Sequence, residues 1–154
     1  MSDQEIGDSI WFMNGHVTIH LSKHTNPDGI SLTEHRLPAA FGPPFHIHLD
    51  EDEVFYILDG EFRFKLGEAI SHGQAGQTIY LPKGVPHGFR VLSPQGGRCI
   101  IITRGGFEDM LRRASRPAEA VRLPEPVQPT PEELARLARA CTENGIDLLG
   151  PPIE

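Results

Sequence analysis

The residues best suited to chemistry in this 154-residue sequence are three histidines and one glutamate. His46 and His48 stand two residues apart in the segment FHIH, which has the composition of a strand. Alternate side chains of a strand leave the same face, roughly 6 to 7 Å apart along the backbone. Both imidazoles can therefore reach one ion, although an isolated pair of this kind is also often a strand feature without a metal.

Glu53 and His87 can complete such a site. Glu53 opens the segment EVFYILDG, in which Glu53, Phe55 and Ile57 share one face, so an inward face would deliver the carboxylate beside the histidines. His87 follows the turn PKGVP, where prolines and a glycine restrict or relax the backbone. Three neutral imidazoles and one carboxylate bind a divalent transition metal well and leave positions open for water, oxygen or substrate.

The elements that must position these residues are short strands. From about residue 9 to residue 103 the chain alternates apolar runs with Gly, Pro, Asn and Asp, which is typical of an antiparallel barrel or sandwich. Asp59-Gly60 predicts a tight two-residue hairpin, because both turn positions tolerate positive φ. Nine strands are expected, namely SIWFM, HVTIHLS, GISLTEHRL, FHIH, EVFYILDG, EFRFKLG, QTIYLP, HGFRVLS and RCIIITRG.

The chain changes character after these strands. The segment GGFEDMLRRAS has the periodicity of a short helix, and residues 116–129, with four prolines, predict an extended tether. Thr130, Pro131 and Glu133 form a helix start, and Gly145 predicts its end. We therefore expect a β domain over residues 1–104 and, packed on it, a C-terminal extension over residues 105–154.

The order of these motifs resembles the cupin superfamily. Two departures are three residues between Gly42 and His46, where the family pattern has five, and Val91 where that pattern has asparagine. Neither position is a metal ligand. The first motif is carried by Gly42, His46, His48, Glu53 and Gly60, and the second by Gly76, Pro82, Gly84 and His87.

The resemblance implies an all-β fold, a cupin jelly-roll β-barrel with short C-terminal helices. It also implies one divalent transition metal, which could be iron, manganese, nickel, cobalt, copper or zinc, held by four ligands in the middle of the barrel. Those ligands are His46, His48, Glu53 and His87.

The segment from Phe107 onward, with Gly150-Pro151-Pro152 near its end, resembles the post-barrel helix, proline-rich tether and terminal helix of small single-domain cupins likened to quercetin 2,3-dioxygenase. That likeness implies an oxidoreductase, a dioxygenase of a small enol or phenolic substrate, with Glu53 as the candidate catalytic base. Two other classes stay open: a non-redox isomerase or lyase, in which the metal acts as a Lewis acid, and a cupin that binds a small ligand without turnover.

The substrate pocket is expected around four apolar residues, Phe55, Ile57, Phe89 and Val91. Two polar segments near it were weighed for a role. In the strand around His35, either this histidine or its two charged neighbours faces inward, and a solvated face is the favoured interpretation. The acidic turn at residues 50–52 is likewise expected to be solvated rather than to accept a proton.

Composition narrows the partners to a small molecule. The net charge is −7 and no block of Lys or Arg stands out, so neither nucleic acid nor an anionic membrane is expected. The first residues lack the basic and apolar parts of a secretory leader. Cys99 and Cys141 are expected to be buried free thiols in a reducing compartment, the cytoplasm. Cupins of this length commonly pair, and an edge strand near the N-terminus needs covering, so we expect a homodimer.

Overall fold

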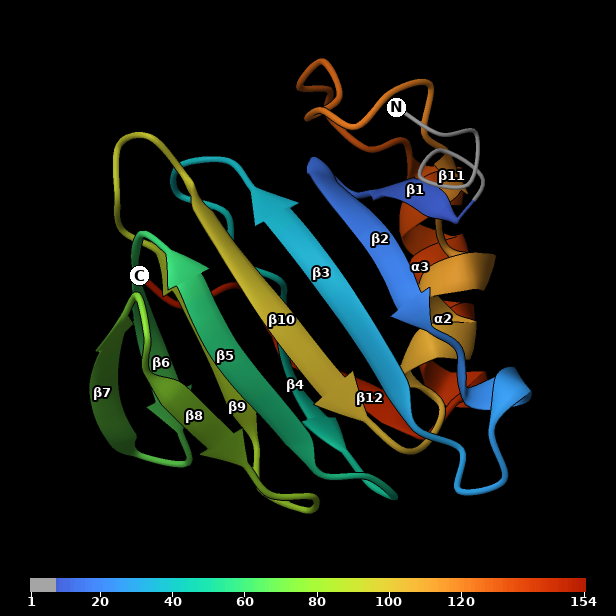
Figure 1. Ribbon diagram of the computed structural model, residues 1–154, viewed down its shortest axis with the longest axis horizontal. Helices are drawn as coiled ribbons and strands as arrows, with labels where there is room; N and C mark the ends of the chain where they lie inside the picture. The colour runs from blue at the N-terminus through green and yellow to red at the C-terminus, as the bar shows by residue number, and fades with distance from the viewer. Residues whose placement is uncertain (1–7) are drawn as a thin grey trace.

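The computed structural model describes residues 8–154, so the prediction about a leader concerns residues outside this range. The fold consists of two antiparallel sheets (Figure 1). One sheet has the order β11 (Arg116–Pro117), β1 (Ser9–Phe12), β2 (Gly15–Leu21), β3 (Ser31–Leu37), β10 (Gly97–Thr103), β5 (Glu53–Asp59) and β8 (Thr78–Leu81). The other has the order β12 (Ile146–Gly150), β4 (Phe45–His48), β9 (His87–Val91), β6 (Glu61–Leu66) and β7 (Ala69–Gln74).

The inward faces of the two sheets form one apolar core. Burial alternates residue by residue along β3 and β5, as expected for strands with one face on a core. Phe55 of β5 packs edge-on against Phe64 of β6 at a centroid distance of 5.2 Å, which joins the two sheets. The expected jelly-roll cupin fold is confirmed, with the difference that the two sheets do not close into a continuous barrel.

The hairpin predicted at Asp59-Gly60 is wrong. β5 belongs to the seven-stranded sheet and β6 to the five-stranded sheet, so the chain crosses between sheets at this point. Gly60 has φ +88°, and a Cβ there would lie 2.7 Å from the Gly96 carbonyl oxygen. Positive φ and close backbone approach suit a sharp corner between sheets as well as a hairpin, and the sequence signal does not separate the two.

Three strands had no counterpart among the nine expected, namely β7, β11 and β12. β7 lacks apolar alternation because only Gly73 among its residues is buried. β12 pairs with β4, placing Ile146 opposite His48 and Leu148 opposite His46. Residues from the expected extension thus contribute β11 to one sheet and β12 to the other, and whether they form a separate unit stays a prediction.

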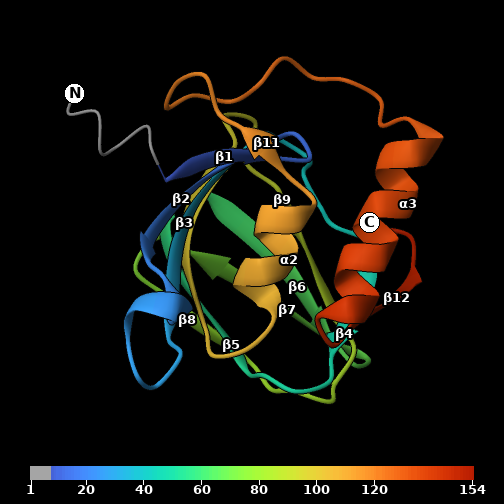
Figure 2. The same ribbon diagram turned by 90° about the vertical axis from the view of Figure 1, so that its right-hand side faces the viewer.

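The helices cover the side on which the two sheets diverge (Figure 2). α2 spans Phe107–Arg113, α3 spans Pro131–Glu143, and a single 3-10 turn, η1, spans Lys23–Thr25. The predicted start of α3 is confirmed, since Thr130 accepts a hydrogen bond from the Glu133 amide at 3.1 Å. Within residues 8–154, neither α2 nor α3 has the length and apolar character of a transmembrane helix. Cys99 and Cys141 are free and buried, as expected.

Candidate metal centre

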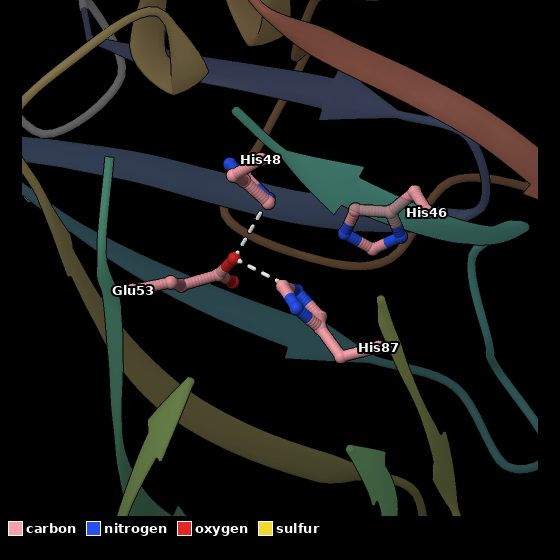
Figure 3. A group of neighbouring side chains, drawn as sticks. All are labelled: His46, His48, Glu53 and His87. Atoms are coloured by element: carbon pink, nitrogen blue, oxygen red, sulfur yellow. Dashed lines mark ion pairs between the residues drawn. The ribbon is translucent and has the colours of Figure 1, made fainter. Parts of the chain in front are cut away.

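Four buried side chains converge between the sheets (Figure 3). His46 and His48 come from β4, Glu53 from the first position of β5, and His87 from the first position of β9. β4 and β9 are paired so that His46 lies opposite His87. One ligand atom from each of the four side chains lies within 4.8 Å of the others. These residues could hold one metal ion, and they are the four expected from the sequence.

The candidate ligand atoms of Glu53, His48 and His87 lie close to one another without forming hydrogen bonds. Oε2 of Glu53 lies 2.9 Å from Nε2 of His48 and 3.4 Å from Nε2 of His87. Nevertheless, none of these three buried atoms has hydrogen-bond geometry with a partner in residues 8–154. Buried polar atoms are normally paired because desolvation without a partner is costly. Two imidazole nitrogens and a carboxylate oxygen directed toward a common point fit a divalent transition metal.

Backbone carbonyls orient two of the imidazoles. Nδ1 of His46 donates to the Pro44 carbonyl oxygen at 2.8 Å, and Nδ1 of His87 lies 3.3 Å from the Val85 carbonyl oxygen. A proton held on Nδ1 leaves the lone pair on Nε2, which is then the nitrogen available to a metal. Pro44 and Val85 each stand two residues before the histidine that they orient, so the adjoining turns set the tautomers.

A buried carboxylate that the sequence did not indicate lies beside Nδ1 of His48, the ring nitrogen that does not face Glu53. Oε2 of Glu51 lies 3.6 Å from Nδ1 of His48, which is too long for a hydrogen bond but close enough for charge attraction. The same oxygen accepts a hydrogen bond from the Phe107 amide at 2.9 Å. The prediction of a solvated turn is therefore wrong for Glu51, although Asp50 and Asp52 are exposed. Glu51 is covered because the chain after β10 returns over it, with Gly105 in close contact.

The charges of the metal-free site are unequal. Burial, followed by repulsion from His87, lowers the pKa of His46 to about 4. Burial also disfavours the charged form of His48, but attraction to Glu53 and Glu51 outweighs it and raises the pKa of His48 to about 10. Burial opposes ionisation of Glu53, yet His48 and His87 hold its pKa well below the usual value. The arrangement is a buried carboxylate–imidazolium pair, whose proton must leave when a metal binds.

A small apolar cavity of about 60 Å³ adjoins the ligand cluster. It is capped by residues of α2, α3 and β12, which come from the C-terminal third of the chain. Its wall includes His35, so the interpretation that this residue faces solvent is wrong; Glu34 and Arg36 point the other way. The apolar part of the wall comprises Phe12, Met13, Phe41, Pro43, Pro44, Phe89, Ile101, Phe107, Met110, Leu137, Cys141, Ile146 and Leu148.

Of the four residues expected to form the substrate pocket, only Phe89 lines this cavity. Phe55, Ile57 and Val91 are almost completely buried in the apolar core and lie outside the lining. The sequence pattern identified them as inward-facing but not which end of the core they occupy. Any contact between these three and a substrate stays a prediction.

Comparison with known proteins supports the class indicated by fold and site. Residues 33–103 match the cupin domain family. No curated protein sequence gives a significant match. This match spans a little less than half of the chain, and the cupin fold and the ordered ligand set agree with it.

Three solved structures illustrate the similarity. A predicted oxalate decarboxylase from Thermotoga maritima has a TM-score of 0.55 at 21% identity, covering 58% of this chain and 79% of that one. KdgF from Halomonas sp. has a TM-score of 0.52 at 18% identity, covering 59% and 79%. The Cnp3 cupin domain of Schizosaccharomyces pombe has a TM-score of 0.54 at 11% identity over 59% of this chain, and the match spans only 64% of that domain. At these identities the likeness shows the fold alone.

Proposed function

We propose that the protein is a metal-dependent oxidoreductase, a dioxygenase that acts on a small enol or phenol. The observation that carries the proposal is the position of the ligand cluster: His46, His48 and Glu53 form one wall of a cavity that is otherwise almost entirely apolar. A bound redox-capable divalent ion would lower the pKa of a coordinated hydroxyl and support electron transfer to oxygen. An apolar, capped cavity excludes water from that chemistry.

Glu53 is the proposed catalytic base. It is the only carboxylate in the lining of the cavity among the described residues. Its carboxylate is held in the ionised form by His48 and His87. Because it is also a ligand candidate, we assign one oxygen to the metal position and the other to the hydroxyl proton of the substrate.

The size of the cavity favours a small substrate. A cavity of about 60 Å³ has room for only a few water molecules. A flavonol would require α2 and α3 to move outward, whereas a compact enol requires a smaller displacement. Pentane-2,4-dione is therefore a better first probe than quercetin.

The test is oxygen consumption by protein reconstituted separately with iron, manganese, nickel, cobalt or copper, using pentane-2,4-dione and a flavonol as probes. We expect oxygen uptake with at least one redox-capable metal, and its loss in Glu53→Gln. Conversion of the same probes with zinc and without oxygen would instead support the isomerase or lyase class. Probe binding without turnover under any of these conditions would indicate a ligand-binding cupin.

We also propose a homodimer, on different grounds from those given by the sequence. β11 pairs with β1 and covers the edge that prompted the expectation. An apolar row instead crosses the outer face of the seven-stranded sheet over five paired strands, and it consists of Leu21, Leu32, Ile102, Val54 and Tyr80. Light scattering with size-exclusion chromatography should give the mass of two chains for the wild type and of one for Tyr80→Lys. A cytoplasmic location stays a prediction.

A further inference from the structure

One polar residue of the cavity wall is not accounted for by the metal centre. His35 stands in the middle of β3, and its side chain faces the cavity with 5% of its surface exposed. The other polar side chains of the lining are His46, His48 and Glu53, all members of the ligand cluster. Among residues 8–154, the lining contains no Lys, Arg, Ser, Asn or Gln. His35 is therefore the one polar group there that is free to contact a ligand of the site.

The orientation of the His35 ring follows from its hydrogen bond. Nε2 lies 2.8 Å from Oγ1 of Thr33, and the Thr33 hydroxyl donates to the Ile101 carbonyl oxygen at 3.3 Å. A hydroxyl has one proton, so this assignment makes the His35 ring the donor at Nε2. Nδ1 then carries a lone pair and no proton. The ring is held in place by stacking on Phe107, at a centroid distance of 6.0 Å.

Nδ1 of His35 is available to the cavity. Within residues 8–154 it has no hydrogen-bond partner, and it is not among the ring nitrogens that are enclosed without one. Burial lowers the pKa of His35 to about 4, so the ring is neutral at neutral pH. A neutral imidazole nitrogen with a free lone pair accepts a hydrogen bond from a hydroxyl group. It offers neither a proton nor a positive charge to an anion.

We propose that His35 is the specificity-determining residue of this cavity: Nδ1 accepts a hydrogen bond from a hydroxyl group of a small, uncharged ligand that faces the metal-ligand cluster. The inference rests on the proposed function for the location of the ligand, not for its turnover. A bound divalent ion would balance one anionic group of a ligand, but a second anionic group, as in an extended dicarboxylate, would lie against apolar side chains and the His35 lone pair. Burial of an unpaired anion is strongly unfavourable, so we expect such ligands to bind weakly.

The test measures binding without turnover. Protein loaded with zinc, which is redox-inert, is titrated calorimetrically with catechol as the uncharged hydroxyl probe and with succinate as the dianionic probe, whose second carboxylate extends away from the metal. His35→Phe removes the acceptor but keeps an aromatic ring against Phe107. We expect the wild type to bind catechol more tightly than succinate, and His35→Phe to bind catechol roughly tenfold more weakly or worse.

Two further variants keep the test decisive. His35→Gln retains an acceptor and is expected to restore part of the catechol affinity. Thr33→Val removes the group that holds the Nε2 proton, frees the tautomer and should weaken catechol binding less than His35→Phe does. Zinc content, measured on each sample, should match the wild type, which separates a loss of recognition from a loss of metal.

Equal catechol affinity in the wild type and His35→Phe would overturn the inference. Tighter binding of succinate than of catechol, or no binding of catechol by the zinc-loaded wild type, would do the same. Catechol binding that depends on His35, combined with no oxygen uptake under any metal, would leave this inference intact and remove the dioxygenase proposal. The two failures are therefore distinguishable.

Discussion

Two buried carboxylates in this molecule, Glu108 and Glu53, differ in their hydrogen bonds. Glu108 in α2 is fully buried and accepts four hydrogen bonds of 2.7 to 2.9 Å, from the Ser22 and Ser31 hydroxyls, the Lys23 amide and the Arg112 guanidinium. Glu53 is 3% exposed, and its Oε2 has no hydrogen-bond partner in the described residues. Hydrogen bonds from the protein satisfy the Glu108 carboxylate, whereas Oε2 of Glu53 remains available as a metal ligand.

The difference separates a structural site from a ligand site. Donors from three segments meet at Glu108 and fix α2 against the region between β2 and β3, which presents Phe107 to the cavity. No comparable set of hydrogen-bond donors reaches Oε2 of Glu53 within residues 8–154, and a bound metal ion could stabilise this atom instead. Burial alone therefore does not indicate a metal ligand, whereas a buried carboxylate oxygen without a hydrogen-bond partner, beside two histidine nitrogens in the same condition, does make Glu53 a candidate.

The largest effect is expected from removing the satisfied carboxylate. Glu108→Ala leaves buried or half-buried hydroxyl, amide and guanidinium donors without their acceptor and should lower the free energy of unfolding by roughly 3 kcal/mol. Urea denaturation of metal-free protein measures this value. Glu108→Gln, which keeps an acceptor oxygen, should lose less. An unchanged unfolding midpoint in Glu108→Ala would show that the network is not structural and would break the comparison.

A smaller effect is expected at the carboxylate behind His48. Glu51→Gln keeps an oxygen for the Phe107 amide but removes the negative charge 3.6 Å from Nδ1 of His48. Removing a carboxylate that orients a metal-binding histidine typically lowers metal affinity about 10- to 100-fold. We expect a loss near the lower limit, because the distance between Glu51 and His48 is long. Competition titration with a chromophoric zinc chelator measures it, with Asp52→Asn as a control in the same turn. Equal affinity in Glu51→Gln and the wild type would remove Glu51 from the metal centre.

The smallest effect is expected on the pH dependence of the free energy of unfolding. Burial disfavours the ionised form of Glu108, but hydrogen bonds from Ser31, the Lys23 amide, Ser22 and Arg112 outweigh it and lower its pKa below the ordinary value of 4.5. A carboxyl whose pKa is lower in the folded state contributes stability above its unfolded pKa and loses it as the pH falls through the folded pKa. Wild type should therefore lose more of its free energy of unfolding than Glu108→Gln between pH 6 and pH 3, in denaturation curves of metal-free protein. Parallel losses in both proteins would contradict this assignment.

Local patterns were sufficient to predict the strands with strong alternation and the four ligand candidates. His46 and His48 share a face because of the period of two in a strand, and Glu53 follows the same rule in β5. β12 could not be predicted, because its burial depends on pairing with β4 about a hundred residues away.

The burial of Glu51 and of His35 was also not predicted, for a related reason. Glu51 is buried only because the chain after β10 passes over it, and the face of β3 that turns inward is decided by its register with β10. Both depend on contacts between segments that are distant in the sequence, and the spacing of residues within one segment does not predict such contacts. A histidine flanked by two charged residues in an alternating strand was the one available signal for His35, and it left both faces open.

The most direct test of the metal centre is elemental analysis of untagged protein purified without chelator. We expect about one divalent transition metal per chain in the wild type and in Glu108→Gln, and its loss in His48→Ala and Glu53→Ala. This result would show that the unsatisfied carboxylate holds an ion and the satisfied one does not. A wild type that takes up no metal even after reconstitution, or a Glu53→Ala variant that retains a full equivalent, would contradict the account.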